Sequence, residues 1–427
     1  MATAEIIKSS IPFDSISSNV ETSRKLSDSP FTVEWLLKAL NENDEKFQKF
    51  AQYHKVANVC AEDISQGKGF ISKVYKVTID FDGLKDGYNV ILKVPGMDSL
   101  IEAASNVTDE EMPVTDKKIA ELHNRECAFY TKYAPLIDIP YVKVFKTTDW
   151  IVGKQHGALL MESMVDNAAS CPIWTGCNSH QMYTVARHMA TLMKHFLCLP
   201  PQEWIEKYPH DLFNSFGENS FYPAFFDKVK EMKPGAFDEG TKKFEKYLNG
   251  NKFLKYTLFG VAEDVGVTPV LSHGDLWANN LLWKKGPDGS LSNELAAIID
   301  WQIIHKGSIT NDLARFITLC VDGDVRREHE FKVLQHYYDT IVKLMEDEGR
   351  KIDFSYEQMK RVYKANFVHQ AIQLMIMGPF LFPSNDLASD QALIKRAQLE
   401  KVLLRAQLAM EDALEYLKEL PEEKLIG

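Results

Sequence analysis

The chain has 427 residues, of which 45% are hydrophobic and 26% charged, and this composition can supply more than one hydrophobic core. The formal net charge of -11 argues against nonspecific nucleic-acid binding, because proteins that bind the phosphate backbone present a basic face. No uninterrupted apolar stretch is long enough to cross a bilayer. The six cysteines form no C-x-x-C pair, which argues against a zinc site and favours reduced thiols in a cytoplasmic protein.

The first part of the chain predicts a small sheet with a helix. Residues 1–30 are Ser-rich and lack the apolar segment of a secretory signal, so we expect a flexible tail. Residues 31–163 are expected to form the first lobe. In chain order, its pattern predicts an opening helix over 31–60, paired antiparallel strands at 70–81 and 88–94, an acidic excursion at 98–116, a helix over 117–133, and strands at 141–147 and 157–161.

After Ser163 the hydrophobic periodicity becomes helical. Helices are expected over 180–199, 222–259, 326–345, 356–377 and 391–420. A strand pair interrupts them, and its turn, Gly286-Pro287-Asp288-Gly289, has hairpin chemistry. The whole chain is therefore expected to be an α+β protein with a second, mainly helical lobe over 164–427 that shares a cleft with the first.

One polar loop carries a recognisable chemical pattern. It reads His273-Gly274-Asp275-Leu276-Trp277-Ala278-Asn279-Asn280, so that Asp275 and Asn280 lie at opposite ends of a tight loop. The apolar run 295–299 then predicts a buried strand that ends at Asp300. Phosphoryl transfer from ATP needs a carboxylate that receives the proton of the acceptor hydroxyl, and separate oxygen ligands for Mg²⁺. Asp275 is the candidate for the first role, and Asn280 and Asp300 are the candidates for the second.

The segments HGDLWANNLLW, IIDWQ and NDLARF are more specific together than a lone H-x-D, which usually marks a turn or a helix cap. They resemble the catalytic segment of the choline-kinase-like small-molecule kinases, which are relatives of aminoglycoside phosphotransferases, and above all the ecdysteroid-kinase-like branch. The resemblance implies a bilobal, protein-kinase-like fold with a small antiparallel-sheet N-lobe and a mainly helical C-lobe. It also implies that His273 braces the loop by hydrogen bonding and that Asp312 supports it from a helix N-terminus.

Lys93 lies in the third strand-like run, where kinase-like folds keep the lysine that contacts the α- and β-phosphates of ATP. A strand edge would also tolerate this lysine as a solubilising charge. Such a lysine needs an anionic partner that fixes its direction. We expect that partner on the helix 117–133, where Glu126 resembles the family's glutamate and Glu121 is the alternative.

Two further segments are candidates for binding the nucleotide. Gly67 and Gly69 flank Lys68, and their backbone N–H groups can approach a phosphate because no Cβ stands in the way. An ordinary hairpin turn is the alternative, since the segment is neither G-x-G-x-x-G nor Walker A. Farther along, Glu162 and Met164 are expected to form an interlobe hinge whose backbone holds adenine.

The expected acceptor is a small molecule. The loop reads H-G-D rather than H-R-D, and too few residues separate Asp300 from Asp312 for a peptide-docking segment. We therefore expect ATP and Mg²⁺ to be used on a steroid-like or other alcohol. A choline or ethanolamine kinase is the enzyme alternative, and a noncatalytic nucleotide-binding regulator is the other. Large aromatic residues are more often part of a core, but candidates for lining an apolar or cation-binding pocket are Trp277, Trp283, Trp301, Tyr337 and Phe380.

Overall fold

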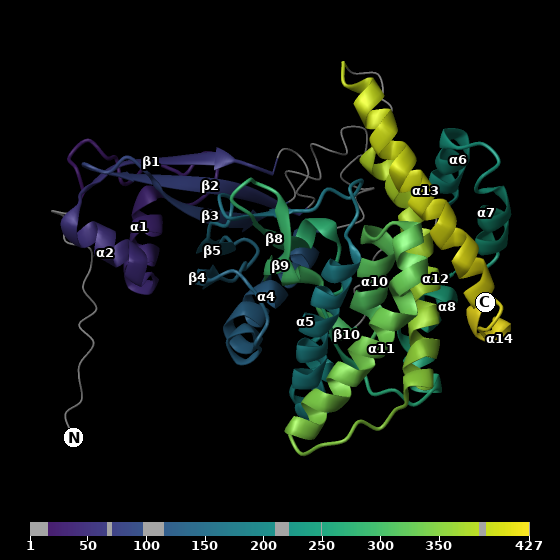
Figure 1. Ribbon diagram of the computed structural model, residues 1–427. Helices are drawn as coiled ribbons and strands as arrows, with labels where there is room; N and C mark the ends of the chain where they lie inside the picture. The colour runs from purple at the N-terminus through teal and green to yellow at the C-terminus, as the bar shows by residue number, and fades with distance from the viewer. Residues whose placement is uncertain are drawn as a thin grey trace. The chain divides into compact units, whose positions relative to one another are not determined.

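The computed structural model describes residues 16–65, 71–96, 115–209, 222–248, 250–383 and 390–426. The chain divides into two compact units, of which unit 1 is Met1–Tyr133 with Val142–Asp166 and unit 2 is Ala134–Tyr141 with Asn167–Gly427. Unit 1 contains an antiparallel sheet and unit 2 is mainly helical (Figure 1). The predicted α+β class, with a small antiparallel sheet and a helical part, is confirmed.

Unit 1 is built around a five-stranded antiparallel sheet in the order β1-β2-β3-β5-β4. Its strands are β1 (Val56–Asp63), β2 (Ser72–Phe81), β3 (Tyr88–Pro95), β4 (Val144–Thr148) and β5 (Ala158–Glu162). Its helices are α1 (Val33–Asn43), α2 (Glu45–Tyr53) and α4 (Asp116–Ala128), which a π-helical turn (Phe129–Tyr133) continues. The β2–β3 hairpin confirms the predicted strand pair. Apolar residues of α1, α2 and the sheet share one core.

The structure corrects two expectations for the beginning of the chain. The opening helix predicted over 31–60 is two helices followed by strand β1, which pairs with β2. Asp44 separates the helices, because its backbone is extended and its side chain accepts a hydrogen bond from the N–H of Lys46 at the start of α2. Residues 16–30 of the expected flexible tail are packed, since Leu26 is fully buried in the unit 1 core. The remainder of that tail lies outside the described residues.

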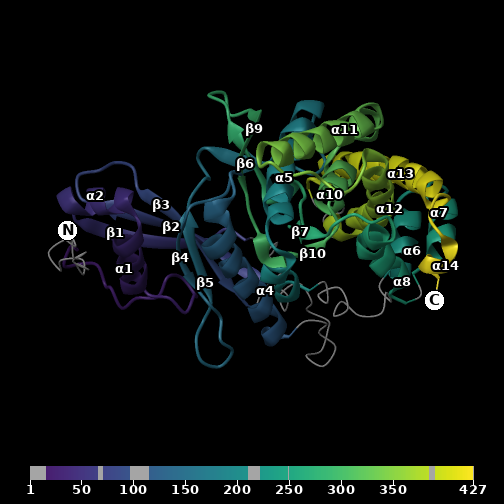
Figure 2. The same cartoon turned by 90° about the horizontal axis from the view of Figure 1, so that it is seen from below.

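Unit 2 surrounds two small groups of strands with long helices. The helices are α5 (Ser179–Cys198), α6 (Tyr222–Met232), α7 (Asp238–Glu245), α8 (Lys252–Lys255), α9 (Val261–Asp264), α10 (Asn311–Cys320), α11 (Gly323–Asp347), α12 (Tyr356–Leu381), α13 (Ala392–Leu417) and α14 (Glu422–Leu425). The strands are β6 (Ala168–Ser170), β7 (Val270–Ser272), β8 (Leu281–Lys285), β9 (Leu291–Ile298) and β10 (His305–Gly307). β8 and β9 form the predicted hairpin, β6 pairs with β8, and β7 pairs with β10. Helix α11 lies against α5 (Figure 2).

The single helix expected over 222–259 is broken into several pieces. α6 ends at Met232, because Pro234 disfavours helical backbone in the residue before it. Gly235 then takes a left-handed φ of 81°, which ends the helical path. A second left-handed glycine, Gly250 with a φ of 91°, precedes α8.

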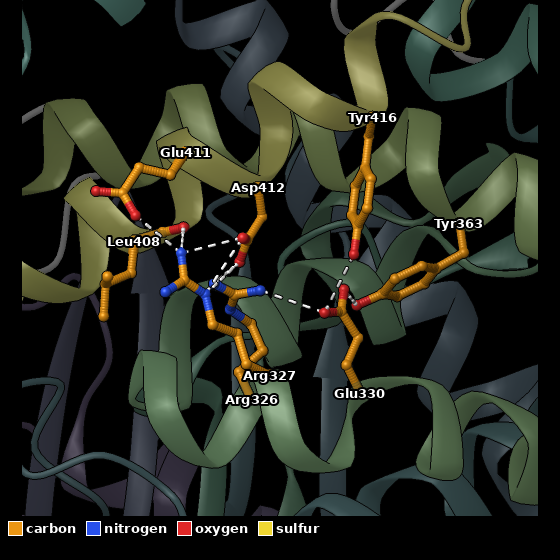
Figure 3. A network of polar contacts seen from close by, with 8 residues as sticks. All are labelled: Arg326, Arg327, Glu330, Tyr363, Leu408, Glu411, Asp412 and Tyr416. Carbon is orange, nitrogen blue, oxygen red and sulfur yellow. Dashed lines mark hydrogen bonds and ion pairs between the residues drawn. The ribbon is translucent and has the colours of Figure 1, made fainter.

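A buried charge network joins α11, α12 and α13 (Figure 3). Arg326 of α11 is fully buried and donates to Glu330 at 3.2 Å and to Asp412 of α13 at 2.5 Å. Tyr363 of α12 donates to Glu330 at 2.8 Å. Burial raises the pKa of Glu330, while Arg326 and Tyr363 favour its charged form. Because buried charges need partners, these contacts tie the three helices together.

Candidate active site

The polar loop at 273–280 is held from helix α10. Asp312, in the first turn of α10, accepts hydrogen bonds from the backbone N–H groups of His273 at 2.7 Å and Gly274 at 2.9 Å. Burial raises the pKa of the Asp312 carboxyl, and the nearby His273 and the two N–H donors oppose that effect. Gly274 has a φ of 87°, and a Cβ there would lie 2.7 Å from the carbonyl oxygen of Ile303. Only glycine fits this turn.

His273 holds the loop through both ring nitrogens. The backbone N–H of Asp275 donates to Nδ1 of His273 at 3.1 Å, so Nδ1 is an acceptor and the ring proton lies on Nε2. Nε2 then donates to the carbonyl oxygen of Ile299 at 3.0 Å. The buried ring also packs against Trp301, with centroids 4.5 Å apart. This geometry fits a bracing role for His273 rather than proton transfer.

Two neighbours orient the Asp275 carboxylate. Arg315 of α10 donates to Oδ1 from Nε at 3.1 Å and from Nη2 at 2.6 Å. Nδ2 of Asn280 donates to the backbone carbonyl of Asp275 at 2.8 Å and to its Oδ2 at 3.2 Å. The Asp275 side chain is 23% exposed, so a ligand can reach it. Oδ2 has the longer and weaker of these contacts.

The β8–β9 hairpin brings Asn280 alongside the chain next to Asp300. The N–H of Ile299 donates to the carbonyl oxygen of Asn280 at 3.0 Å, which extends the ladder one step beyond the Leu281–Ile298 pair. Because Nδ2 of Asn280 is engaged with Asp275, its Oδ1 is the atom available to a metal ion. Asp300 adopts a left-handed backbone with a φ of 68°.

The donor chemistry of this pair suits Mg²⁺. One amide oxygen and one carboxylate are hard oxygen ligands, and Mg²⁺ usually takes only one or two protein ligands and completes its shell with water and phosphate oxygens. Across the described ranges, no group of three or more His, Cys, Asp and Glu side chains could hold a metal ion. A metal at this position would therefore depend on Asn280, Asp300 and the phosphates of a nucleotide.

Lys93 and Glu126 form an ion pair within unit 1. Nζ of Lys93 donates to Oε2 of Glu126 at 2.7 Å, and the Glu126 side chain is only 1% exposed. β3 lies between β2 and β5, so Lys93 does not occupy a sheet edge and the solubilising role does not apply. Glu121 instead pairs with Lys118 at 3.0 Å and Arg125 at 2.6 Å. The geometry thus favours Glu126 over Glu121 as the partner of Lys93.

The expected hinge begins at the end of β5. The N–H of Glu162 donates to the carbonyl oxygen of Lys143 at 2.9 Å, and its side chain accepts from the N–H of Lys143 at 2.6 Å. The Glu162 N–H is therefore occupied. Met164 follows, half-buried. The remaining candidates, Gly67, Lys68 and Gly69, lie outside the described residues, as does 97–114, most of the acidic excursion.

Three of the five aromatic candidates belong to the core. Trp283, Trp301 and Tyr337 are fully buried. Nε1 of Trp301 donates to the carbonyl oxygen of Ile298 at 3.0 Å, and the hydroxyl of Tyr337 donates to that of Ile309 at 2.7 Å. These contacts are structural, so the expectation that these three residues line a pocket is wrong.

The sequence reasoning missed Arg315 and Gln370. Besides its bonds to Asp275, Arg315 donates from Nη1 to Oε1 of Gln370 on α12 at 3.0 Å. A signal for Arg315 was available in N-D-L-A-R, because residues three apart lie on neighbouring positions of a helix face and Asp312 already marked that face. Gln370 carried no comparable signal, because only tertiary packing brings α12 to α10.

A family model described as DUF1679, Uncharacterized oxidoreductase dhs-27, matches residues 38–419. The chain belongs to this family. The Caenorhabditis elegans protein named Uncharacterized oxidoreductase dhs-27 is 26% identical over 360 residues, which cover 80% of this chain and 41% of that protein. The Caenorhabditis elegans protein named Uncharacterized kinase-like protein D1044.1 is 25% identical over 140 residues, which cover 33% of this chain and 31% of that protein. This DUF1679 chain thus spans less than half the length of the curated relatives it matches.

Solved structures of small-molecule kinases are similar to this DUF1679 protein. A choline kinase from Cryptosporidium parvum is 12% identical, with a TM-score of 0.48 and coverage of 90% of this chain and 96% of that chain. The GDP complex of aminoglycoside 2'-phosphotransferase-IIIa is 12% identical, with a TM-score of 0.42 and coverage of 83% and 95%. At these values the likeness carries no argument about substrate or cofactor. One relative is named kinase-like, in agreement with the predicted resemblance to small-molecule kinases. In the described parts of the chain, no helix has the length and apolarity of a bilayer span.

Proposed function

We propose that this DUF1679 protein is an ATP- and Mg²⁺-dependent phosphotransferase that acts on a hydroxyl group of a small molecule, steroid-like or otherwise. The observation that carries the proposal is the Asp275 carboxylate. It is partly exposed, it is oriented by Arg315 and Asn280, and it lies in a loop anchored by Asp312. An oriented carboxylate next to oxygen ligands for a metal is the arrangement that phosphoryl transfer to an alcohol requires.

Each step of the proposed transfer would use particular side chains of unit 2. The acceptor oxygen attacks the γ-phosphorus while the bond from that phosphorus to the β-phosphate oxygen breaks, and ADP leaves. The hydroxyl proton passes to Oδ2 of Asp275, whose other oxygen is held by Arg315. Oδ1 of Asn280 and the carboxylate of Asp300 would hold Mg²⁺, which when bound neutralises negative charge on the phosphates.

Unit 1 would supply the nucleotide contacts. Lys93, aimed by its ion pair with Glu126, would contact the α- and β-phosphates. The carbonyl of Glu162 and the backbone of Met164 would hold adenine, and the N–H groups of the 67–69 turn would approach the phosphates. The protein is proposed to work in the cytoplasm, where ATP is plentiful and its six cysteines stay reduced.

The oxidoreductase name in the family description and of one relative does not change this proposal. That name belongs to a protein of which the match covers 41%. The present sequence contains no G-x-G-x-x-G dinucleotide fingerprint, the glycine pattern that lets a helix N-terminus receive a pyrophosphate. A noncatalytic nucleotide-binding regulator is disfavoured, because Asp275, Asn280 and Asp300 are all chemically competent for catalysis.

ADP formation tests the proposal directly. Purified protein is incubated with ATP, with and without Mg²⁺, and with choline, ethanolamine, an aminoglycoside or a hydroxylated steroid. We expect ADP formation that depends on both Mg²⁺ and one acceptor class, and a phosphorylated acceptor of matching mass. ATP binding without turnover on any acceptor would instead favour the regulator. Preference for choline would favour the choline kinase alternative.

A further inference from the structure

The negative charge of Asp275 is already balanced inside unit 2. Arg315 places two N–H groups on Oδ1 of Asp275, and its own side chain is 17% exposed. A positively charged acceptor that approaches Asp275 would therefore meet the guanidinium of Arg315 as well as the carboxylate. The positive charge of such an acceptor and that of the guanidinium would repel each other, and the partial burial of Arg315 weakens the screening of this repulsion by solvent.

One face of α12 continues from Arg315 toward the C-terminal end of that helix. Asn366, Gln370, Gln373 and Met377 share this face, because they recur at helical spacing. Gln370 is buried and accepts from Arg315, whereas Gln373 and Met377 are half-buried. The face therefore becomes more accessible with distance from Arg315, as expected of a surface along which a bound molecule extends from Asp275.

Two titratable groups beside this face, His369 and Tyr222, are uncharged at neutral pH. Burial, together with the charge of Arg315, lowers the pKa of His369 to about 3. Gln373 donates to the hydroxyl of Tyr222 at 2.7 Å, and burial raises the pKa of Tyr222 to about 12. From Asn366 to its end, α12 contains no Asp or Glu.

Two of the helices packed against α12, α6 and α10, add no available anion to this face. α6 turns Tyr222 and Phe226 inward, while its two acidic residues, Asp227 and Glu231, are exposed. On α10, the carboxylate of Asp312 is occupied by two backbone N–H groups of the catalytic loop. On the described parts of α6, α10 and α12 that border this face, a cationic acceptor would therefore find no unoccupied carboxylate to replace its lost hydration.

We propose that the acceptor lies along the Gln370–Gln373 face of α12 and is an uncharged hydroxyl compound, with Arg315 excluding cationic acceptors and Gln373 acting as a specificity-determining hydrogen-bonding group. This inference rests on the proposed phosphotransferase activity and narrows its acceptor class. Neutral amides can hydrogen-bond hydroxyl and carbonyl groups of such a compound without the desolvation cost of burying a charge.

Matched acceptors that differ only in charge test the inference. Choline is compared with 3,3-dimethylbutan-1-ol, which has the same shape without the charge, and a hydroxysteroid is compared with its amino-substituted analogue. ADP formation is measured for each pair, and kcat/KM is expected to be at least about tenfold higher for the uncharged member, the scale of one lost favourable contact. Higher kcat/KM for the charged members would overturn the inference while leaving the phosphotransferase proposal intact. Turnover with neither member of either pair would overturn both.

A charge introduced on the face supplies an independent readout. Gln373→Glu is expected to raise the choline to dimethylbutanol ratio of kcat/KM by about tenfold, because a carboxylate there compensates the cation. Gln373→Met removes the hydrogen-bonding amide without adding a charge, so kcat/KM for the hydroxysteroid is expected to fall while the choline to dimethylbutanol ratio does not rise. Gln202→Glu, an exposed glutamine in unit 2, is the matched control. A ratio unchanged by Gln373→Glu in folded protein would remove Gln373 from the acceptor site.

Discussion

Arg315 and Asp275 are joined by two hydrogen bonds that converge on one carboxylate oxygen, from Nε at 3.1 Å and from Nη2 at 2.6 Å. The pair sets the direction of the carboxylate and leaves Oδ2 facing its weaker partner, Nδ2 of Asn280 at 3.2 Å. A carboxylate held by a planar guanidinium has little rotational freedom. Catalysis in this site would thus depend on a residue that does not itself react.

Replacing Asp275 should separate binding from chemistry. Asp275→Asn keeps the shape of the side chain but loses the carboxylate that receives the hydroxyl proton. We expect kcat to fall by roughly 10² to 10⁴, the usual cost of losing a general base. ATP affinity, measured by calorimetric titration, should stay within about threefold, a shift small beside one lost hydrogen bond. Near-native turnover in the folded variant would show that Asp275 is not the catalytic carboxylate.

Arg315 should affect turnover without affecting nucleotide binding. Arg315→Ala removes both donors to Asp275, and hydrogen bonds to charged groups contribute about 1.5 to 3 kcal/mol, so kcat should fall by about tenfold or more. Arg315→Lys keeps the charge but offers no planar fork, and an intermediate rate is expected. Arg361→Ala, at an exposed position of α12, is the control. If KM for ATP rises while kcat is unchanged, Arg315 does not act through Asp275.

The two proposed metal ligands should respond in Mg²⁺ titrations. Asn280→Ala and Asp300→Asn each weaken an oxygen ligand, so the Mg²⁺ concentration for half-maximal turnover should increase severalfold or more. Asparagine is chosen at 300 because it tolerates left-handed backbone. Asn279→Ala, at the exposed neighbour of Asn280, is the matched control. A lower maximal rate with an unchanged titration midpoint would argue that these residues do not contact the metal.

Lys93 and Glu126 should behave as one unit in ATP use. If Glu126 aims the ammonium at the phosphates, Lys93→Met and Glu126→Gln each weaken productive ATP binding, and the double variant costs little more than either. The neighbouring exposed pair, Lys118 and Glu121 at 3.0 Å, provides a control cycle in which small and additive effects are expected. Additive losses in the Lys93 and Glu126 cycle would contradict the coupling.

His369 should make the folded state sensitive to acid. Its pKa of about 3 in the folded protein lies below the ordinary value of 6.5, so the stability it contributes is present above pH 6.5 and is lost as the pH falls toward 3. The expected slope is at most about 1.4 kcal/mol of unfolding free energy per pH unit. Urea titrations between pH 6.5 and 5 should show a shallower loss for His369→Gln than for the wild type. His180→Gln, on the exposed side of α5, should keep the wild-type slope, and an equal slope in His369→Gln would refute the assignment.

The parts of the fold that could be predicted from sequence are those in which local pattern and tertiary burial agree. The β2–β3 pair and helix α5 have clear strand and helix periods, and they form as expected. The prediction of one helix over 31–60 was wrong because Asp44 caps a new helix. In addition, β1 is an edge strand whose polar residues hide the alternation of apolar and polar positions that marks a strand. Edge strands carry a weaker signal than central ones.

The residues of the candidate site also fall into two groups, those that the sequence could predict and those that only tertiary packing reveals. Asp275, Asn280 and Asp300 could be proposed from sequence because close spacing along the chain limits where their side chains lie. The contacts of Arg315 with Gln370 and of Gln373 with Tyr222 join segments distant in sequence, and only the packing of α12 against α10 and α6 reveals them. Nothing in a single sequence specifies that packing.

The left-handed backbone at Asp300 sets stability against function at one position. Most residues with a side chain lose roughly 1 to 2 kcal/mol in that conformation, Asp and Asn lose less, and glycine adopts it freely. Selection for a more stable fold alone would therefore replace Asp300 with glycine, and the proposed metal ligand would disappear with the strain. Under the proposed function, a thermostabilised descendant of this protein that carries glycine at 300 would fold well and lack a ligand for the metal that phosphoryl transfer needs.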